Sequence, residues 1–202
     1  MTMPSEERSA SDPIRLATPL DEGMRRNLQC GDPVLLSGTI FTARDAAHRR
    51  MVEAYHRGEP LPFDLRGQVI YYTGPSPTPP GAVVGALGPT TSGRMDPYTP
   101  LLLELGLRGM IGKGRRSAEV VRCMERFGAV YFGATGGAAA LLARAVRRVR
   151  PVAYEDLGPE AITALEVEDF PVTVVVDTRG HDLYAEGPAA YLERQRDLRP
   201  GA

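Results

Sequence analysis

Three positively charged side chains stand singly in glycine-bounded loops or at the expected start of a helix, where each could bind a small anion. Arg94 lies in the run from Gly88 to Asp96, Lys113 is the only lysine of the chain and lies between two glycines, and Arg44 falls in the expected first turn of a helix. An arginine fork binds a carboxylate through paired hydrogen bonds, and lysine acts as a compact point charge. Because no acidic cluster lies near them in the sequence, they imply a small polyanionic substrate such as a dicarboxylate.

Hydroxyl groups accompany Arg94 in the same run. Thr90, Thr91 and Ser92 follow a glycine and a proline. Small residues let a ligand approach the backbone, and hydroxyls can donate or accept hydrogen bonds. The run therefore fits either a ligand site at the end of a strand or a solvated loop with a surface ion pair.

The glycine-rich turns do not match the fingerprints of nucleotide-binding proteins. The run Gly133-Ala-Thr-Gly-Gly-Ala138 lacks two glycines of the dinucleotide motif, and Lys113 is followed by glycine where a phosphate-binding loop requires serine or threonine. We interpret the pair at 136–137 as a tight strand-to-helix turn, and nucleotide binding as the weaker alternative.

Other polar residues near these runs are expected to serve structure more than chemistry. His48 could orient a ligand, but a satisfied core or interface histidine is the simpler interpretation. Asp45 and Asp96 are expected to hold their neighbouring arginines or to cap helices, in preference to acting as bases. The remaining arginines near the site are expected on solvated helix faces or at helix C-termini: Arg115, Arg116, Arg144, Arg147, Arg148 and Arg150.

The composition predicts a single globular domain. The chain has 202 residues, 43% of them hydrophobic, with 24 basic against 25 acidic side chains. The balanced charge argues against nucleic acid or an anionic membrane as a partner. Cys30 and Cys123 are far apart and belong to no cluster, so we expect core residues and no metal site of this chain's own. The first twelve residues are polar and no apolar run approaches 18 residues, so we expect neither a signal peptide nor a membrane span, and a cytoplasmic protein.

Strands and helices alternate along the chain, which favours an α/β fold with glycine-rich strand-to-helix turns. We expect a disordered tail over 1–13, one domain over 14–185 and a helical extension over 186–202. Strands are expected at Ile14–Leu20, Val34–Ile40, Val69–Tyr72, Val83–Leu87, Ala129–Phe132 and Val172–Val176. Helices are expected at Asp21–Leu28, from a Thr42–Asp45 capping box to Tyr55, at Tyr98–Leu105 and Ala118–Phe127, from the glycine turn to Arg150, in a short piece from Pro159, and at Pro188–Leu198.

Five stretches, in order along residues 14–184, together resemble the C-terminal domain of class I fumarases and the β subunit of two-subunit fumarase and L(+)-tartrate dehydratase. The stretches are Gly38–His48, Gly88–Tyr98, Ile111–Gly114, Tyr131–Ala139 and Glu166–Pro171. The resemblance implies a swivelling β/β/α domain. It also implies an iron-sulfur hydro-lyase that reversibly hydrates a small dicarboxylate, most simply fumarate to (S)-malate. A tartrate dehydratase subunit and a non-catalytic assembly module of the same fold are the alternatives.

The resemblance further implies how the active site is shared. A 4Fe-4S cluster is expected on a partner α subunit, in a heterodimer or heterotetramer, with no cluster ligand from this chain. Arg44, Arg94 and Lys113 correspond to ligands of the substrate carboxylates. Thr90 corresponds to the proton-transfer group, with Thr91 as the alternative. A threonine hydroxyl is a poor base unless nearby cations and N–H dipoles favour its alkoxide.

Overall fold

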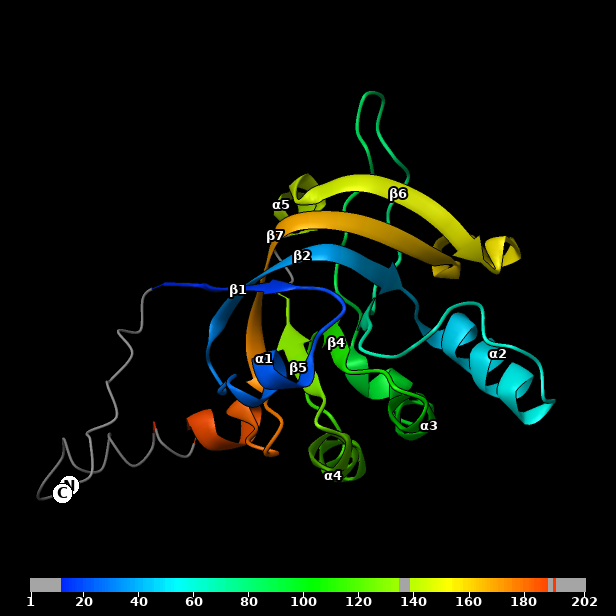
Figure 1. The fold of residues 1–202 in the computed structure, drawn as a ribbon. Helices are drawn as coiled ribbons and strands as arrows, with labels where there is room; N and C mark the ends of the chain where they lie inside the picture. The colour runs from blue at the N-terminus through cyan, green and yellow to red at the C-terminus, as the bar shows by residue number, and fades with distance from the viewer. Residues whose placement is uncertain (1–11, 135–138, 189–190, 192–202) are drawn as a thin grey trace, which may run out of the picture.

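The computed structural model describes residues 12–134, 139–188 and 191, which fold as a mixed α/β domain around one seven-stranded sheet (Figure 1). The strands are β1 (Ile14–Ala17), β2 (Pro33–Thr42), β3 (Val69–Tyr71), β4 (Gly109–Gly112), β5 (Val130–Gly133), β6 (Val146–Ala153) and β7 (Ile162–Val176). The helices are α1 (Glu22–Arg26), α2 (Asp45–His56), α3 (Thr99–Glu104), α4 (Ala118–Phe127) and α5 (Ala139–Arg144), with 3-10 turns η1 (Ser92–Met95) and η3 (Glu155–Glu160).

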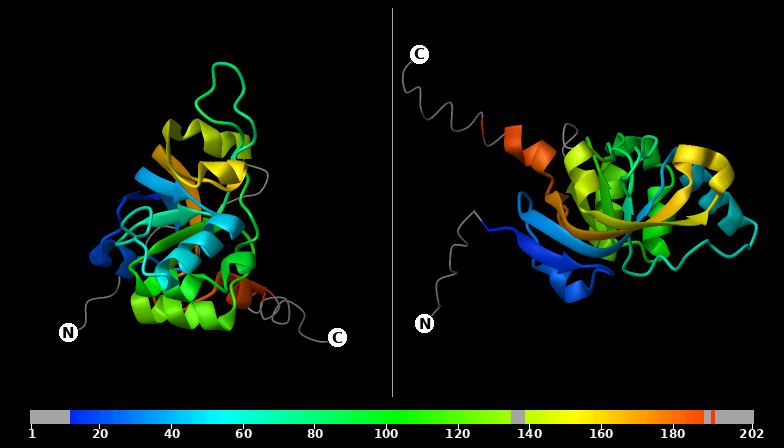
Figure 2. Two further views of the ribbon diagram at one scale, coloured as in Figure 1. Left: turned by 90° about the vertical axis from the view of Figure 1, so that its right-hand side faces the viewer. Right: turned by 90° about the horizontal axis from the view of Figure 1, so that it is seen from above.

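The sheet curls back on itself. Its strand order is β1-β2-β3-β4-β5-β7-β6, and β2 also pairs with β7. Strands β1 to β5 are parallel, whereas β7 runs antiparallel to β2, β5 and β6. Since β7 pairs with both β2 and β5, the strands β2, β3, β4, β5 and β7 form a closed ring, and Figure 2 shows β2 and β7 as long curved neighbours. The carboxyl ends of the four parallel strands β2 to β5 consequently lie at one edge.

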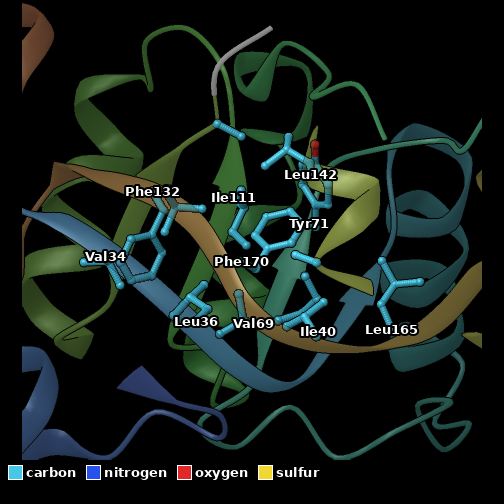
Figure 3. Close-up of a cluster of buried hydrophobic side chains, with 14 of the residues drawn as sticks. Val34, Leu36, Ile40, Val69, Tyr71, Ile111, Phe132, Leu142, Leu165 and Phe170 are labelled. Atoms are coloured by element: carbon cyan, nitrogen blue, oxygen red, sulfur yellow. The ribbon is translucent and has the colours of Figure 1, made fainter. Parts of the chain in front are cut away.

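The alternation of side chains along each strand divides the core between the two faces of the sheet. Tyr71, Phe132 and Phe170 belong to a buried cluster on one face, which Figure 3 shows enclosed by the curved strands. Ile70 and Tyr131, their neighbours in sequence, belong to a second cluster on the other face, which includes buried side chains of α2, α3 and α4. Each fully buried apolar side chain stabilises the fold by roughly 1.5–3 kcal/mol. The core is therefore mainly aliphatic, with buried tyrosines and phenylalanines added.

The ends of α1 and α4 follow the capping signals of the sequence. Asp21 accepts a hydrogen bond from the amide of Met24 at 2.7 Å, and Ser117 accepts one from the amide of Val120 at 3.3 Å. Helix α4 ends at Gly128, whose φ of 61° is left-handed. These two helices confirm the predictions made for them.

The predicted capping box at Thr42 and Asp45 is wrong. Thr42 is the last residue of β2, and its hydroxyl donates to the carbonyl of Ala161 at 3.3 Å and accepts from the amide of Thr163 at 3.1 Å. The N-cap of α2 is Arg44, which is extended and makes no side-chain capping bond. The neighbouring strand β7 thus takes the hydroxyl that the local pattern assigned to the helix.

The predicted helix up to Arg150 is also wrong beyond Arg144. Helix α5 ends there, and β6 follows as an edge strand paired with β7. Arg147 and Arg148 therefore lie on a strand, with their guanidinium groups 2.8 Å from Glu168 and 3.7 Å from Glu166. Strand β7 itself begins ten residues earlier than Val172, the expected start.

Residues 83–87 do not form the predicted strand. They belong to a loop over residues 74–88 that projects past β6 in Figure 1. The amide of Ser76 donates to the carbonyl of Ala86 at 3.1 Å, and the amide of Ala86 donates to the Ser76 hydroxyl at 2.9 Å. The prolines over 75–80 lack the backbone N–H that a helix or an inner strand requires, in agreement with the loop that this segment forms.

Some predictions fall outside the described residues. These are the glycine pair at 136–137, most of the tail over 1–13 and most of the helix at Pro188–Leu198, although residues 183–188 are helical. Within the described ranges, no helix is long and apolar enough to cross a membrane.

Candidate active site at the carboxyl edge of the parallel strands

The structure brings the segments carrying Arg44, Thr90, Arg94 and Lys113 together at the carboxyl edge of β2, β3 and β4. Arg44 follows the end of β2, and Lys113 follows β4. The segment with Thr90 crosses between them. The amide of Thr90 donates to the carbonyl of Tyr72 at 2.7 Å, and the amide of Ser92 donates to the carbonyl of Lys113 at 2.8 Å. Backbone pairing therefore fixes the hydroxyl-rich run beside the strand ends, the edge at which open α/β sheets bind ligands.

Arg94 is fixed by a carboxylate from another element. Its Nε lies 2.9 Å from Oδ1 of Asp45, in the first turn of α2. The Arg94 side chain is 57% exposed, against 25% for Asp45. The pair connects η1 to α2 and leaves the rest of the exposed guanidinium accessible to an anion. The sequence prediction paired Asp45 with its neighbour Arg44, so the partner is corrected.

Arg44 lies against the backbone where the projecting loop begins. A Cβ added at Gly74 would lie 2.9 Å from Cζ and 3.0 Å from Nε of Arg44. One terminal nitrogen of Arg44 is 3.5 Å from Glu160, whose other oxygen accepts from the amide of Ala46 at 2.8 Å. The Nε atom is buried and has no hydrogen-bond partner within the described residues. Gly74 is therefore required for the observed position of this guanidinium.

A second glycine makes room for the hydroxyl-rich run. A Cβ at Gly112 would lie 2.0 Å from Oγ of Ser92 and 3.3 Å from the carbonyl oxygen of Thr90. Any larger residue at Gly112 would push this run off the end of β4. Lys113 follows directly and is exposed, whereas Thr90 is half-buried and Thr91 is exposed.

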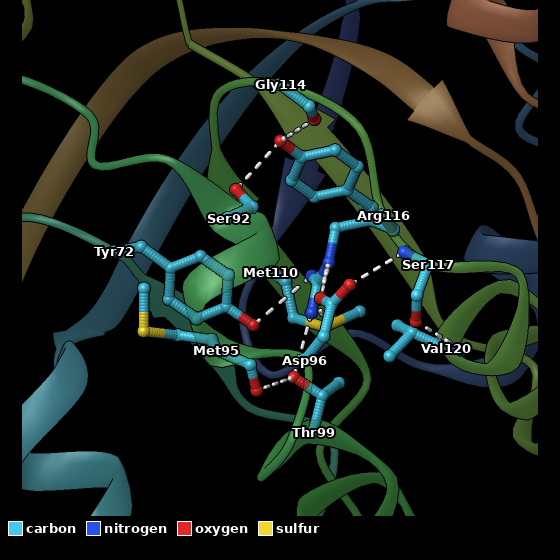
Figure 4. Close-up of polar contacts among 11 residues, drawn as sticks. Tyr72, Ser92, Met95, Asp96, Thr99, Met110, Gly114, Arg116, Ser117 and Val120 are labelled. Atoms are coloured by element: carbon cyan, nitrogen blue, oxygen red, sulfur yellow. Dashed lines mark hydrogen bonds and ion pairs between the residues drawn. The ribbon is translucent and has the colours of Figure 1, made fainter.

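The buried Arg116 contacts residues of the segment that follows the hydroxyl run, as Figure 4 shows. Arg116 donates to Oδ1 of Asp96 at 2.7 Å and to Oγ1 of Thr99 at 2.8 Å. Its Cζ lies 5.4 Å from the ring centre of Tyr72 and 5.3 Å from that of Tyr131, in cation–π range. The Arg116 side chain is 0% exposed. The prediction of a solvated helix face is therefore wrong for Arg116, which fixes Asp96 at the end of η1.

Tyr131 connects this buried arginine to the glycine-flanked lysine. Its hydroxyl is 2.8 Å from Oγ of Ser92 and donates to the carbonyl of Gly114 at 2.9 Å. Burial raises the pKa of Tyr131, so the phenol stays protonated and can donate. The hydroxyl run and the loop of Lys113 are thereby held to β5.

His48 is a core residue with unusual surroundings. It is fully buried in α2, its ring lies 5.2 Å from that of Tyr72, and neither ring nitrogen has a hydrogen-bond partner in the described part of the chain. Burial lowers the pKa of His48 to about 3, so the imidazole is neutral at physiological pH. The expected core location is confirmed, but the expected hydrogen bonds are not found.

The described cysteines do not fit an iron-sulfur site. No group of three or more His, Cys, Asp or Glu residues that could hold a metal occurs in the described ranges. The Cys30 thiol donates to the carbonyls of Val175 at 3.1 Å and His181 at 2.9 Å, and burial raises its pKa to about 11. Such a thiol resists the deprotonation that ligation requires. Both Cys30 and Cys123 are only half-buried, a correction to the prediction of core residues.

The geometry defines an α/β domain with a cationic, hydroxyl-bearing edge suited to a small acid anion. Residues 2–187 match the family described as Fumarase C-terminus. The chain belongs to this family, and the match agrees with the motifs of the hydroxyl run and the Gly-Lys-Gly loop.

Curated relatives include longer proteins named fumarate hydratase and one protein named as a subunit. Fumarate hydratase 2 of Leishmania major is 41% identical over 86% of this chain and 31% of that protein. The anaerobic class I fumarate hydratase of Escherichia coli is 44% identical over 75% of this chain and 28% of that protein. The protein named "Putative L(+)-tartrate dehydratase subunit beta" of Methanocaldococcus jannaschii is 39% identical over 86% of this chain and 92% of that protein. The chain thus spans less than a third of each of these two fumarate hydratases.

Proposed function

We propose that this chain is the β-type subunit of an iron-sulfur hydro-lyase that interconverts fumarate and (S)-malate. The observation that carries the proposal is the convergence of Arg44, Arg94 and Lys113 at one strand edge, with the Thr90 run paired between them. Three cations at one edge match a substrate with two carboxylates. The fumarate hydratases among the relatives support this choice of substrate.

In this proposal the three cations bind and orient the dicarboxylate. Arg94 presents the exposed part of its guanidinium while Asp45 fixes its Nε. Arg44 is restrained by Gly74 and Glu160, and Lys113 supplies a point charge from its exposed loop. When both carboxylates are fixed, the substrate bond that must break is oriented toward the proton-transfer group. Such positioning lowers the activation barrier.

Thr90 is the proposed proton-transfer group. It is half-buried, and its position is fixed because its backbone pairs with Tyr72 and Lys113. Neighbouring cations lower the cost of forming an alkoxide on its oxygen. Thr91, next in the chain and more exposed, is the alternative for this role.

The iron-sulfur cluster belongs, in this proposal, to a partner α subunit in a heterodimer or heterotetramer. The Cys30 and Cys123 environments support this placement, because they offer no cluster site within the described residues. We further propose that residues 14–185 form a swivelling β/β/α domain that closes on that partner, and that the complex works in the cytoplasm. The closed ring of strands is compatible with a rigid body that moves as one unit.

L(+)-tartrate dehydration is the second candidate. It is favoured by the Methanocaldococcus jannaschii relative, of which this chain covers 92%. The two substrates differ in their hydroxyl groups, which a few polar side chains can discriminate.

The test is anaerobic co-purification with a candidate α subunit encoded beside this chain, followed by initial rates on fumarate and L(+)-tartrate. The proposal predicts no turnover by this chain alone and a higher kcat/KM for fumarate in the complex. A higher value for tartrate selects the second candidate. Full turnover by the α subunit alone would overturn both and leave a non-catalytic assembly module.

A further inference from the structure

Five arginines line a hollow at the opposite edge of the sheet from the candidate active site. The hollow has a volume of about 550 Å³ and is lined by residues of α1, of the C-terminal end of α4 and of the segment after β7. Arg108 directly precedes β4, and Gly128 lies at the amino end of β5. The five arginines are Arg25, Arg26, Arg108, Arg126 and Arg179.

Three of these arginines have no carboxylate partner within the described residues. Arg26 pairs with Glu22, and a terminal guanidinium nitrogen of Arg179 lies 3.1 Å from Oδ2 of Asp177. Arg25, Arg108 and Arg126 form no such ion pair in the ranges that the structure describes. Elsewhere in the site region, both Arg94 and Arg116 are paired. Among the described residues, the lining also includes the carboxylates of Glu22 and Glu125, so five arginines face two glutamates and the hollow keeps an excess of positive charge.

The backbone and one ring hold these guanidinium groups in place. Arg25 is only 7% exposed and donates through Nε to the carbonyl of Asp21 at 3.1 Å. Arg108 donates to the carbonyls of Leu103 and Leu107 at 2.7 and 2.8 Å. The ring of Phe127 lies 5.9 Å from Cζ of Arg108 and 5.2 Å from that of Arg126. The arrangement is preorganised, as in binding sites that lose little side-chain freedom when a ligand enters.

Burial and one neighbouring positive charge both act on Arg25 in the hollow. Burial, followed by the charge of Arg108, lowers the pKa of Arg25. Burial also lowers the pKa of Arg108. Helix dipoles favour basic residues in the last turn, which accounts for Arg25 and Arg26 in α1 and for Arg126 in α4. Arg108 lies in no helix, so the dipoles do not account for it. An anion in the hollow would offset the repulsion directly.

We propose that this arginine hollow is a second anion site, which binds one small multivalent oxyanion such as phosphate or a dicarboxylate. Guanidinium forks match the oxygen pairs of both ions. The volume suits a small molecule, and the nearly balanced charge of the whole chain argues against a nucleic-acid surface. The site lies at the amino ends of β4 and β5, so its occupancy is independent of the hydro-lyase assignment.

Isothermal titration calorimetry on the full chain at low ionic strength tests the proposal, with inorganic phosphate and succinate as the two probes. The background variant carries Arg94→Gln and Lys113→Gln, which removes two cations of the carboxyl edge. We expect at least one probe to bind this background, and Arg126→Gln to weaken it by about tenfold, as for the loss of one charge-assisted hydrogen bond. The probe that binds more tightly identifies the ligand as phosphate-like or dicarboxylate-like.

Arg122→Gln is the matched control, because Arg122 is exposed on the same helix but does not line the hollow. It should leave the affinity unchanged. Equal weakening by both variants would show diffuse surface charge, and binding lost in the background variant would place the anion at the carboxyl edge. Either result, or no binding of either probe, overturns the proposal. Arg126 is exposed, so its replacement does not endanger the fold.

Discussion

The carboxylate of Asp45 holds Nε of Arg94 at 2.9 Å and so joins the first turn of α2 to the 3-10 turn after the hydroxyl run. Neither residue lies in a strand, yet the pair sets the direction in which a cation is presented at the strand edge. The two aspartates that lie close to arginines in the sequence, Asp45 and Asp96, have different roles. Asp45 orients a binding arginine, whereas Asp96 pairs with the buried Arg116.

Replacing Asp45 by Asn should lower kcat/KM of the assembled enzyme by about tenfold or more, because a hydrogen bond to a charged group contributes roughly 1.5–3 kcal/mol. The loss should appear mainly in KM, since Arg94 binds substrate in our proposal. Asp64→Asn is the control, because Asp64 forms an exposed pair with Arg66. If the two variants have equal kcat/KM, Asp45 does not position Arg94.

Gly74→Ala should displace Arg44, because the new Cβ would lie 2.9 Å from its Cζ and 2.8 Å from the carbonyl oxygen of Pro159. We expect KM to rise about tenfold and the free energy of unfolding to fall by about 1–3 kcal/mol, the usual effect of overpacking. Gly187→Ala is the control, since nothing lies within 4 Å of its added Cβ. Steady-state kinetics and urea unfolding separate the two effects, and an unchanged KM would argue against a binding role for Arg44.

His48 predicts a pH dependence of stability. Its pKa is about 3 in the folded chain, whereas the pKa of a histidine in an unfolded chain is about 6.5. Between these values the unfolded state binds the extra proton, so the free energy of unfolding falls by up to about 1.4 kcal/mol for each pH unit of acidification.

The measurement is urea unfolding at pH 7 and pH 5 for the native chain, His48→Phe and His56→Phe. The first variant should lose part of the acid sensitivity, whereas His56, exposed at the end of α2, should not matter. An acid sensitivity equal in all three proteins would contradict the buried neutral imidazole.

Arg116→Met should destabilise the fold by about 3–5 kcal/mol, because it leaves the carboxylate of Asp96 partly buried without its cation. Replacing Asp96 by Asn in the same chain should recover part of the loss. Arg115→Met changes the exposed neighbour and should shift the free energy of unfolding by less than about 0.5 kcal/mol. A small effect of Arg116→Met would mean that the network in Figure 4 contributes little.

Sequence patterns predicted the elements whose ends depend on interactions between residues close together in the chain. The ends of α4 follow from Ser117 and Gly128, and the β-branched run at Val172–Val176 does lie in a buried strand. Strand β6 could not be found this way. Its arginine-rich segment continues an alanine-rich helix, and only the distant pairing with β7 makes it a strand. The predicted strand at Val83–Leu87 fails for the same reason, because no neighbouring strand pairs with it.

In the candidate site, too, local motifs could be predicted from the sequence, whereas contacts between distant segments could not. The family motifs identified Arg44, Arg94, Lys113 and Thr90 as candidates, and the structure brings their segments to one edge. The ion pair between Asp45 and Arg94 was missed. Adjacency in sequence suggested Arg44 as the partner of Asp45, although consecutive residues at a helix do not face each other.

Arg116 was missed because nothing local marks it. Its burial depends on Tyr72, which follows β3, and on Tyr131, which lies within β5. The close approaches at Gly74 and Gly112 likewise become visible only when distant segments are placed together. A signal for both glycines does exist, since Gly112 is the last residue of the apolar strand β4 and Gly74 lies three residues after β3, both at the edge where ligands bind.

The most direct test of substrate binding at the carboxyl edge is the kcat/KM of Arg94→Gln for fumarate in the anaerobically assembled complex, beside Arg66→Gln as an exposed control. Arg94 is more than half exposed, so the variant should assemble and melt like the native chain. We expect a loss of about a hundredfold for Arg94→Gln, as when a buried or substrate-bound charge pair is broken, and none for Arg66→Gln. Native kcat/KM in the Arg94 variant would contradict the claim that this edge binds the substrate carboxylates.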